Sequence, residues 1–288
     1  MEKIKHFLKL GKNPAALGRK CLVLALAAMV AAPAVADDDF GIWTSLAAEK
    51  KFNKKISLEA GIDFRSEQKL KSVSRWSGSL GVGYKPWKFL KFSAGYAYIY
   101  DRSVQEAKVN YTNSGKINGY NVDHGYWRSK HRAYVDATGK LDVGRFTFSL
   151  RERYQYTHTM GTTCLRDRYR DTAPGGSGGD IYYWNGEGFI ETTTGEDDKN
   201  HKNNHYFRSR LQVSYNIKGL PLEPFVSYEI SNNLSDGFAL DKTRITVGTD
   251  WKINKKHKLS LAYLYQDGAD DDSNDNIHVI DLGYKFEF

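Results

Sequence analysis

The chain has 288 residues, 42 Lys and Arg, 34 Asp and Glu, and a formal net charge of +8. Residues 1–36 hold six of the basic residues and one of the acidic ones. Beyond them 36 basic and 33 acidic residues remain, a balance that gives no reason to expect a nucleic-acid partner. Cys164 is the one cysteine beyond residue 36, which excludes an intramolecular disulfide in that part of the chain.

The first 36 residues have the pattern of a cleaved secretory signal peptide. A basic region is followed by the uncharged run CLVLALAAMVAAPAVA, residues 21–36. This run is shorter than the roughly 20 residues that a membrane-spanning helix needs. It ends in Ala34-Val35-Ala36, the small-residue pattern of a cleavage site. We therefore predict cleavage there, with Ala34 and Ala36 as the recognition residues, and export of residues 37–288.

The exported part shows alternation of apolar and polar residues with a period of two. In ISLEAGIDF, for example, Ile56, Leu58 and Ile62 share one side of an extended chain, and Glu59 and Asp63 share the other. Such segments are long enough to cross a bilayer as tilted strands. There are eleven of them, beginning near residues 40, 56, 73, 90, 126, 144, 205, 223, 243, 258 and 277.

The connections between these segments alternate in length. Short turns are expected at 53–55, 85–87, 138–140, 218–221 and 254–256, and longer polar loops at 66–72, 102–125, 159–203, 232–241 and 267–276. Short turns on one side and long loops on the other are typical of outer-membrane β-barrels, in which the short turns face the periplasm. A β-sandwich would also alternate, but it gives no reason for this asymmetry.

The last residues, DLGYKFEF, have the pattern of a complete strand. Tyr284, Phe286 and Phe288 lie on one side of it. Lipid offers no hydrogen-bond partners, so the last strand of a transmembrane barrel must pair with the first. A C-terminal strand of this kind, ending in Phe, resembles the assembly signal of bacterial outer-membrane proteins, which implies their assembly machinery as a partner.

These observations predict an all-β protein, a single antiparallel transmembrane β-barrel of 10 to 12 strands, with residues 159–203 as a long extracellular loop. If both termini are periplasmic the strand number is even. We expect twelve strands, or ten if residues 40–52 do not span. The stretch IYYWNGEGFIETT, residues 181–193, predicts a hairpin around Asn185-Gly186, outside the membrane.

The polar sides of the strands are expected to face the lumen, where function would reside. The predicted pore-lining residues are Arg75, Arg128, Lys130, Arg132, Arg145, Arg151, Arg153, Arg208, Arg210, Arg244, Glu59, Asp63, Glu229 and Asp250. Arg–carboxylate pairs could fill the lumen as a structural plug. Alternatively, the arginines could line a narrow pore for small solutes, anions in particular. Glu152 is an exception, because strict alternation aims it at lipid.

Two other classes of function stay open. An outer-membrane enzyme acting on lipids or peptides would need a nucleophile or activated water, a His and an orienting group. The sequence shows no recognisable motif of that kind, so we predict no catalytic residue, no metal site and no cofactor. An adhesin or receptor acting through loops 102–125 and 159–203 is the other alternative. The expected surroundings are the lipid bilayer of the bacterial outer membrane.

Several stretches resemble one known family. They are FGIWTSLAAEKKFNKKISLEAGIDFRSEQ, RERYQY, FRSRLQVSY, PFVSYEI, RITVGTDW and the end IHVIDLGYKFEF. Their order along the chain resembles domain of unknown function 2490 over most of residues 40–288, with a departure at loop 159–203. The resemblance implies an outer-membrane barrel of uncharacterised function and supplies no catalytic residue.

Overall fold

The computed structural model describes residues 39–67, 69–115, 117–170, 181–184, 187–268 and 276–288. The predicted signal peptide, with Ala34 and Ala36, lies outside these residues. The described chain forms two compact units. The barrel unit comprises the residues up to Ile99 together with His131–Thr157 and Asn204–Phe288, and the second unit comprises Tyr100–Lys130 and His158–Asn203. In the described ranges, no helix is both long enough and apolar enough to cross a membrane.

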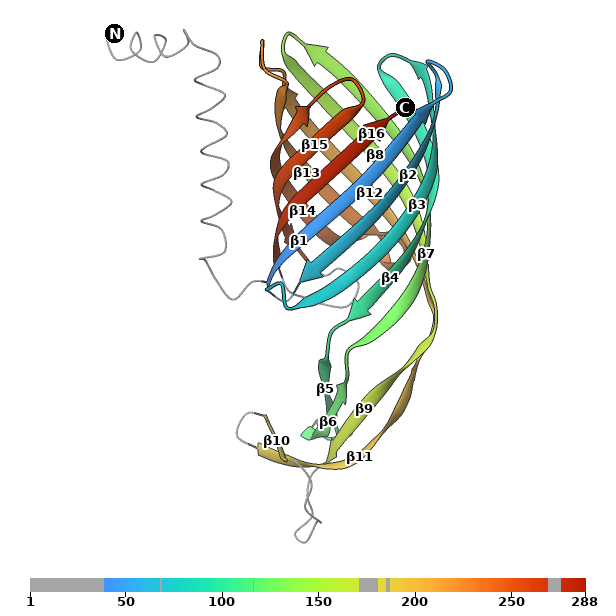
Figure 1. The fold of residues 1–288 in the computed structure, drawn as a ribbon. Coiled ribbons are helices and arrows are strands. Elements are labelled where there is room, and N and C mark those ends of the chain that lie inside the picture. Colours follow the sequence, from blue (N-terminus) through green and yellow to red (C-terminus); the bar gives the residue numbers. More distant parts are fainter. Residues whose placement is uncertain (1–38, 68, 116, 171–180, 185–186, 269–275) are drawn as a thin grey trace, which may run out of the picture. The chain divides into compact units, whose positions relative to one another are not determined.

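The barrel unit is a closed sheet of eleven strands (Figure 1). Its strands are β1 (Asp39–Lys51), β2 (Ile56–Glu67), β3 (Ser72–Trp87), β4 (Leu90–Ser103), β7 (Tyr126–Val143), β8 (Phe146–Thr159), β12 (Lys202–Tyr215), β13 (Leu222–Asn233), β14 (Ala239–Lys252), β15 (His257–Asp267) and β16 (Ile277–Glu287). Four of them, β4, β7, β8 and β12, also contribute residues to the second unit. The order around the barrel is β1-β16-β15-β14-β13-β12-β8-β7-β4-β3-β2, so every strand has two neighbours and no edge is left open.

The all-β barrel and its eleven segments are confirmed, but the prediction of twelve strands is wrong. The reason lies in the closing seam, the pair formed by β1 and β16. These strands pair in parallel, in register from Asp39↔Ile277 to Glu49↔Glu287. An even number follows only if every neighbouring pair is antiparallel, and one parallel pair closes a barrel with an odd number.

The parallel seam also corrects the expected placement of the termini. Because β1 and β16 run in the same direction, Asp39 lies at one end of the barrel and Phe288 at the other. Phe288 shares its end with the short turn between β1 and β2, so we call this the short-turn end. The expectation that both termini lie on one side is therefore wrong.

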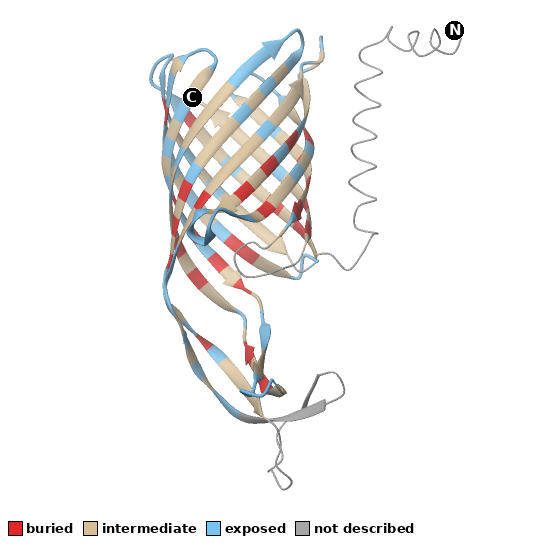
Figure 2. Ribbon diagram, turned by 180° about the vertical axis from the view of Figure 1, so that it is seen from behind, coloured by how far each residue is buried: buried red, intermediate tan, exposed pale blue. Residues whose placement is uncertain are grey.

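Alternation along the strands separates two surfaces of the barrel. The outward positions carry apolar residues that are freely accessible, for example Leu46 at 59%, Ile62 at 58% and Leu80 at 60% exposure. Residues between them along the strands are less accessible, as the alternating colours of Figure 2 show. The inward positions carry most of the charge, which follows the period of two expected for a strand.

The outward face repeats one aromatic arrangement four times. In each case a Tyr hydroxyl and a His Nδ1 on neighbouring strands lie 2.5–2.7 Å apart. The pairs are Tyr96–His131, Tyr154–His205, Tyr263–His278 and Tyr284–His257. Rings that are apolar on their faces and polar at their tips suit the boundary between hydrocarbon and water.

Two of the expected turns lie elsewhere. Residues 85–87 belong to β3, and β4 begins at Leu90. Residues 138–140 belong to β7, which continues to Val143 and turns at Gly144. Gly144 has a φ of +62°, a conformation that costs other residues energy, so it determines where this hairpin turns.

The second unit contains a five-stranded sheet in the order β10-β11-β9-β6-β5. Its strands are β5 (Glu106–Tyr111), β6 (Ile117–Asp123), β9 (Thr162–Arg170), β10 (Ile181–Trp184) and β11 (Glu187–Lys199). The stretches expected as loops 102–125 and 159–203 thus build a sheet of their own. The hairpin predicted within residues 181–193 is confirmed by the pairing of β10 with β11, which begins at Trp184↔Glu187.

Candidate functional site

The barrel encloses a polar cavity of about 800 Å³, lined by residues from all eleven barrel strands. Twelve Lys and Arg side chains and seven Asp and Glu side chains contribute to the lining, so basic groups are in excess. A volume of this size is within the range of pockets that hold small ligands. The cavity is therefore the candidate functional site.

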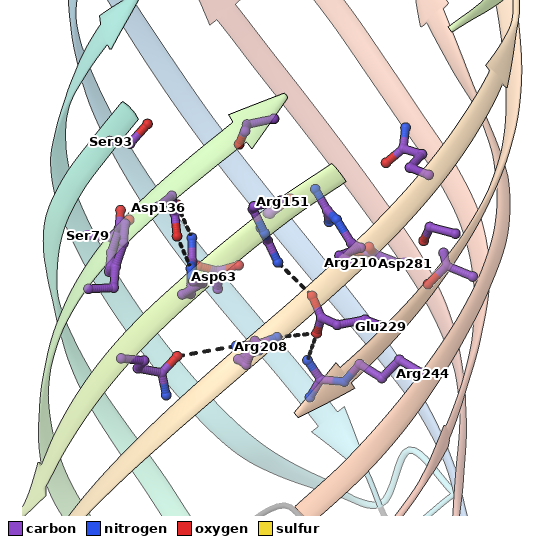
Figure 3. A pocket seen from close by; sticks show the side chains of 18 of the residues that line it. Asp63, Ser79, Ser93, Asp136, Arg151, Arg208, Arg210, Glu229, Arg244 and Asp281 are labelled. Atoms are coloured by element: carbon purple, nitrogen blue, oxygen red, sulfur yellow. Dashed lines mark hydrogen bonds and ion pairs between the residues drawn. The ribbon is translucent and has the colours of Figure 1, made fainter. Parts of the chain in front are cut away.

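The most concentrated charge surrounds Glu229 on β13 (Figure 3). Arg151 Nη2 lies 2.6 Å from Glu229 Oε2, and Arg244 Nη1 lies 3.5 Å from Oε1. Arg208 forms a third ion pair with the same carboxylate. We call these three arginines and Glu229 the Glu229 cluster. One carboxylate thus contacts three guanidinium groups, and positive charge is in excess within the cluster.

Strand register explains why these side chains converge. Glu229 lies directly opposite Arg210 on β12 and directly opposite Arg244 on β14. All three face inward, because they occupy matching positions on neighbouring strands. Among the described residues, Arg210 makes no ion pair, although it lines the same cavity. Arg210 therefore adds a positive charge that the cluster does not balance.

Neutral side chains orient two arginines of the cluster. Arg208 Nη1 donates to Gln155 Oε1 at 3.3 Å, and Arg244 Nε donates to Gln266 Oε1 at 2.7 Å. The Arg244 guanidinium also lies 5.4 Å from the ring centroid of Trp43. These contacts fix the direction of each guanidinium without removing its charge.

A second ion pair lies on the wall formed by β7 and β8. Arg153 donates from Nε and Nη2 to the two carboxylate oxygens of Asp136, at 2.6 and 2.8 Å. The same guanidinium lies 4.2 Å from the Tyr134 ring centroid. The Tyr134 ring lies against Gly95, where a Cβ would overlap it, and its hydroxyl approaches Gly81. Tyr134 thus occupies lumen space that two glycines leave open.

Further ion pairs line or border the lumen. Lys91 pairs with Glu59 at 2.7 Å, Lys258 with Asp250 at 2.6 Å and Lys285 with Glu49 at 2.6 Å. Lys285 also lies 3.9 Å from Glu59, so in this group three lysines are balanced by three carboxylates. The excess of positive charge is therefore greatest around Glu229.

Eleven of the fourteen predicted pore-lining residues do line the cavity: Arg75, Arg132, Arg151, Arg153, Arg208, Arg210, Arg244, Glu59, Asp63, Glu229 and Asp250. Three do not. Arg128 and Lys130 belong to the second unit, where Arg128 donates to the carbonyl oxygens of Met160 and Asn200 and Lys130 pairs with Asp101 at 2.9 Å. Arg145 is an exposed residue of the β7–β8 turn. Their role in a pore is not supported by these positions.

The lumen residues that the sequence argument missed include Tyr134, Asp136 and Trp43. Tyr134 and Asp136 occupy the same side of β7 as Arg132, so alternation already indicated them. Trp43 shares the inward side of β1 with Ser45. The Arg65 guanidinium lies 3.7 Å from the centroid of the Trp43 ring. An aromatic residue at an inward position gave no signal, because the apolar side was assigned to lipid.

The second unit contains one cluster that has ligand types suited to a metal. Ligand atoms of Asp123, Cys164 and Asp197 lie within 4.8 Å of one another. However, Arg166 Nε and Lys199 Nζ each lie 2.5 Å from Asp123 oxygens, and Arg166 also binds Asp197 at 2.7 Å. Because these cations already occupy the carboxylates, we interpret the group as an ion-pair cluster.

The titration of this cluster reflects the same contacts. Burial favours the neutral carboxyl of Asp123, but hydrogen bonds from Arg166 and Lys199 outweigh that effect and lower its pKa to about 2. Burial raises the pKa of the Cys164 thiol above its usual value. Cys164 is therefore a buried thiol beside a fixed ion pair.

Comparison with known proteins places the barrel in a family. The model of the family described as protein of unknown function (DUF2490) matches residues 40–277. The chain belongs to the DUF2490 family. Among solved structures, this DUF2490 barrel is similar to the β-domain of the Bordetella autotransporter BrkA, at 11% identity and a TM-score of 0.41, over 80% of this chain and 78% of that one. A search of the curated proteins gave no match.

Proposed function

We propose that this protein resides in the bacterial outer membrane and that its barrel lumen is a narrow pore that favours small anions. The observation that carries the proposal is the Glu229 cluster together with Arg210, which places four guanidinium groups around one carboxylate inside a closed barrel. Membrane residence is supported by the outward belt of exposed apolar residues and by the signal-peptide pattern.

The anion preference follows from the charge balance. A solute in a narrow lumen loses part of its hydration shell, so fixed charges on the wall determine which ions meet the lower barrier. Three of the four arginines share one negative charge and Arg210 has no ion pair in the described part of the chain. Arg210 would attract a nearby anion and repel a nearby cation, and both effects would be strongest at low salt.

The one-to-one ion pairs favour a second candidate, a structural barrel whose lumen is plugged. Arg153–Asp136, Lys91–Glu59 and Lys258–Asp250 place bulky side chains along the wall of the same cavity. If these side chains leave no continuous path, the barrel would not conduct. The lumen arginines would then serve stability alone.

Single-channel recording distinguishes the two candidates. The refolded protein without residues 1–36 is inserted into a planar bilayer under a salt gradient, and the reversal potential gives the ion selectivity. We expect a small conductance with anion preference, and we expect Arg210→Ala to weaken that preference. Arg145→Ala is the matched control, because it removes an exposed arginine outside the cavity. Silence from protein shown to be folded and inserted would contradict the pore and favour the plugged barrel.

A further inference from the structure

Charge is distributed unequally between the two ends of the barrel unit. The five hairpin turns of the short-turn end, with their adjoining residues, contain fourteen Lys and Arg and one acid, Asp142. We call these segments the basic rim: residues 50–57, 84–91, 140–147, 216–222 and 251–258. The stretches that connect β2 to β3, β13 to β14 and β15 to β16 join strands at the opposite end. These stretches, residues 66–72, 232–241 and 267–276, contain two Lys and eight Asp and Glu.

The basic rim is a ring and not a patch. Each turn joins two neighbouring strands, and the turns follow one another around the barrel, at the end where Phe288 lies (Figure 1). The rim lysines that are exposed and make no ion pair among the described residues include Lys54, Lys55, Lys88, Lys218, Lys255 and Lys256. Their positive charge is therefore available to a partner outside the chain.

These lysines do not hold the turns together. In the turn between β1 and β2, Asn53 Oδ1 accepts a hydrogen bond from the backbone N–H of Lys55 at 2.8 Å. In the turn between β14 and β15, Asn254 Oδ1 accepts one from the backbone N–H of Lys256, also at 2.8 Å. Asparagine side chains thus fix the backbone of both Asn-Lys-Lys turns, as is common in turns of this kind. The lysine side chains can be replaced without removing these hydrogen bonds.

Large apolar side chains lie between the basic residues of the rim. Phe52, which follows Lys51, is 63% exposed. Lys88 lies between Trp87 and Phe89, two exposed residues whose rings stack with centroids 6.0 Å apart. Exposed aromatic rings beside lysines are typical of segments at a membrane interface, where the rings enter the hydrocarbon and the ammonium groups extend to the headgroups.

An aromatic pair marks the depth of the rim. The hydroxyl of Tyr284 lies 2.6 Å from Nδ1 of His257, one of the four outward pairs that suit the boundary between hydrocarbon and water. His257 is the first residue of β15, so the turn that carries Lys255 and Lys256 follows directly beyond this boundary. The long lysine side chains are therefore placed at the level of lipid phosphates.

We propose that the basic rim binds the anionic phosphate headgroups of phospholipids, in the leaflet that the short-turn end reaches. The inference rests on the membrane residence proposed above. The headgroup region offers phosphate and hydrocarbon together, which the lysines and the aromatic rings of the rim require. Lipid also surrounds a barrel on all sides, as the ring of turns does, whereas an acidic protein would cover one part of the ring. The acidic opposite end would repel the same headgroups.

Lipid selectivity in vesicles tests the proposal. The refolded protein without residues 1–36 is inserted into phosphatidylcholine vesicles that contain a trace of spin-labelled phosphatidylglycerol or of spin-labelled phosphatidylcholine. Electron spin resonance measures the fraction of each label that the protein immobilises. We expect a preference for phosphatidylglycerol, up to about fivefold at a headgroup that one lysine serves. High salt should reduce the preference, because it screens exposed charges.

Substitutions assign the preference to the rim. Lys255→Gln combined with Lys256→Gln should lower it, and Lys54→Gln combined with Lys55→Gln should lower it by a similar factor, because the two turns share their sequence. The matched control is Lys69→Gln combined with Lys71→Gln, which removes two exposed lysines from the acidic end and should leave the preference unchanged. Equal losses in the rim and control variants, or equal immobilisation of the two lipids by the natural protein, would overturn the proposal.

The outcome is separable from that of the proposed function. Inserted protein that conducts without preferring phosphatidylglycerol contradicts the role of the basic rim and leaves membrane residence and the pore standing. Inserted protein that shows the preference without conducting supports the rim and contradicts the pore. Protein that does not insert into vesicles contradicts membrane residence, and the rim proposal fails with it.

Discussion

Arg151 and Glu229 form an ion pair of 2.6 Å across an intervening strand, since β12 lies between β8 and β13. The pair therefore connects β8 with β13. Arg208 on the intervening strand β12 binds the same carboxylate, so three strands are linked. An inward charge in this barrel is thus tied to side chains from several strands. Changes at Glu229 should affect both the selectivity of the lumen and its stability.

The first prediction concerns Glu229→Gln. Removing the carboxylate charge leaves Arg151, Arg208 and Arg244 unbalanced, so anion preference should increase and the barrel should lose about 3 kcal/mol of stability. Reversal potential and urea unfolding in vesicles measure the two effects. Glu223→Gln is the control, since Glu223 pairs with the exposed Lys252 and does not line the cavity. A shift of Glu229→Gln toward cations would contradict the role assigned to the cluster.

The second prediction concerns the glycine beneath Tyr134. A Cβ on Gly95 would overlap the Tyr134 ring and lie 2.8 Å from the carbonyl oxygen of Leu80. Gly95→Ala should therefore lower the free energy of unfolding by about 1–3 kcal/mol. A Cβ on Gly78 meets nothing within 4 Å, so Gly78→Ala should have little effect. Equal losses in the two variants would show that overlap with Tyr134 is not the cause.

The third prediction concerns acid stability in the second unit. The pKa of Asp123 falls from 3.8 to about 2 on folding. An acid with a lowered pKa contributes stability above its unfolded pKa and loses it as the pH falls through the folded value. The contribution, on the order of 2 kcal/mol, should therefore disappear between about pH 4 and pH 2.

The buried Cys164 reports on this loss. Its reaction with dithiodipyridine, which proceeds at acidic pH, should accelerate as the pH falls from 4 to 2. Asp123→Asn should react faster throughout and with a flatter pH profile. An unchanged rate in the natural protein over that range would argue against a stabilising role of the Asp123 ion pairs.

The fourth prediction concerns the last residue. The N–H of Phe288 donates to the carbonyl of Glu49 at 2.9 Å, and its ring makes an edge contact with Phe286 at 4.5 Å. Phe288→Ala removes the ring alone, whereas deletion removes both contacts. We expect the folded, heat-modifiable fraction in isolated outer membranes to fall in the order natural protein, Phe288→Ala, deletion. Equal assembly of all three would contradict the predicted assembly signal.

The sequence indicated the strands well and their closure poorly. Alternation identified all eleven barrel strands, because successive residues alternate between the apolar outward surface and the polar lumen. It could not show that Asp39 pairs with Ile277 in parallel, because alternation is the same whichever way the neighbouring strand runs. Gly139 also suggested a turn, but the chain turns at Gly144. The turn requires a positive φ, which Gly144 adopts and which the sequence alone does not assign to either glycine.

For the site, alternation indicated the direction of each side chain but not its partner. Arg151 and Arg208 were expected inward, yet their meeting at Glu229 depends on the stagger between strands, which spacing along one strand does not reveal. Arg128 and Lys130 follow the same alternation as Arg132 and lie beyond the barrel unit. Alternation therefore does not show where along a strand the lumen ends.

The parallel seam has a consequence for how the protein reaches its final topology. If the barrel resides in the outer membrane as proposed, the chain enters the membrane from one compartment, yet Asp39 and Phe288 finish at opposite ends of the barrel. The leading end of β1 must therefore cross the bilayer while the trailing end of β16 stays behind. A reporter fused ahead of Asp39 and one fused behind Phe288 would face different compartments, so export of this chain carries its first strand through the membrane and not merely into it.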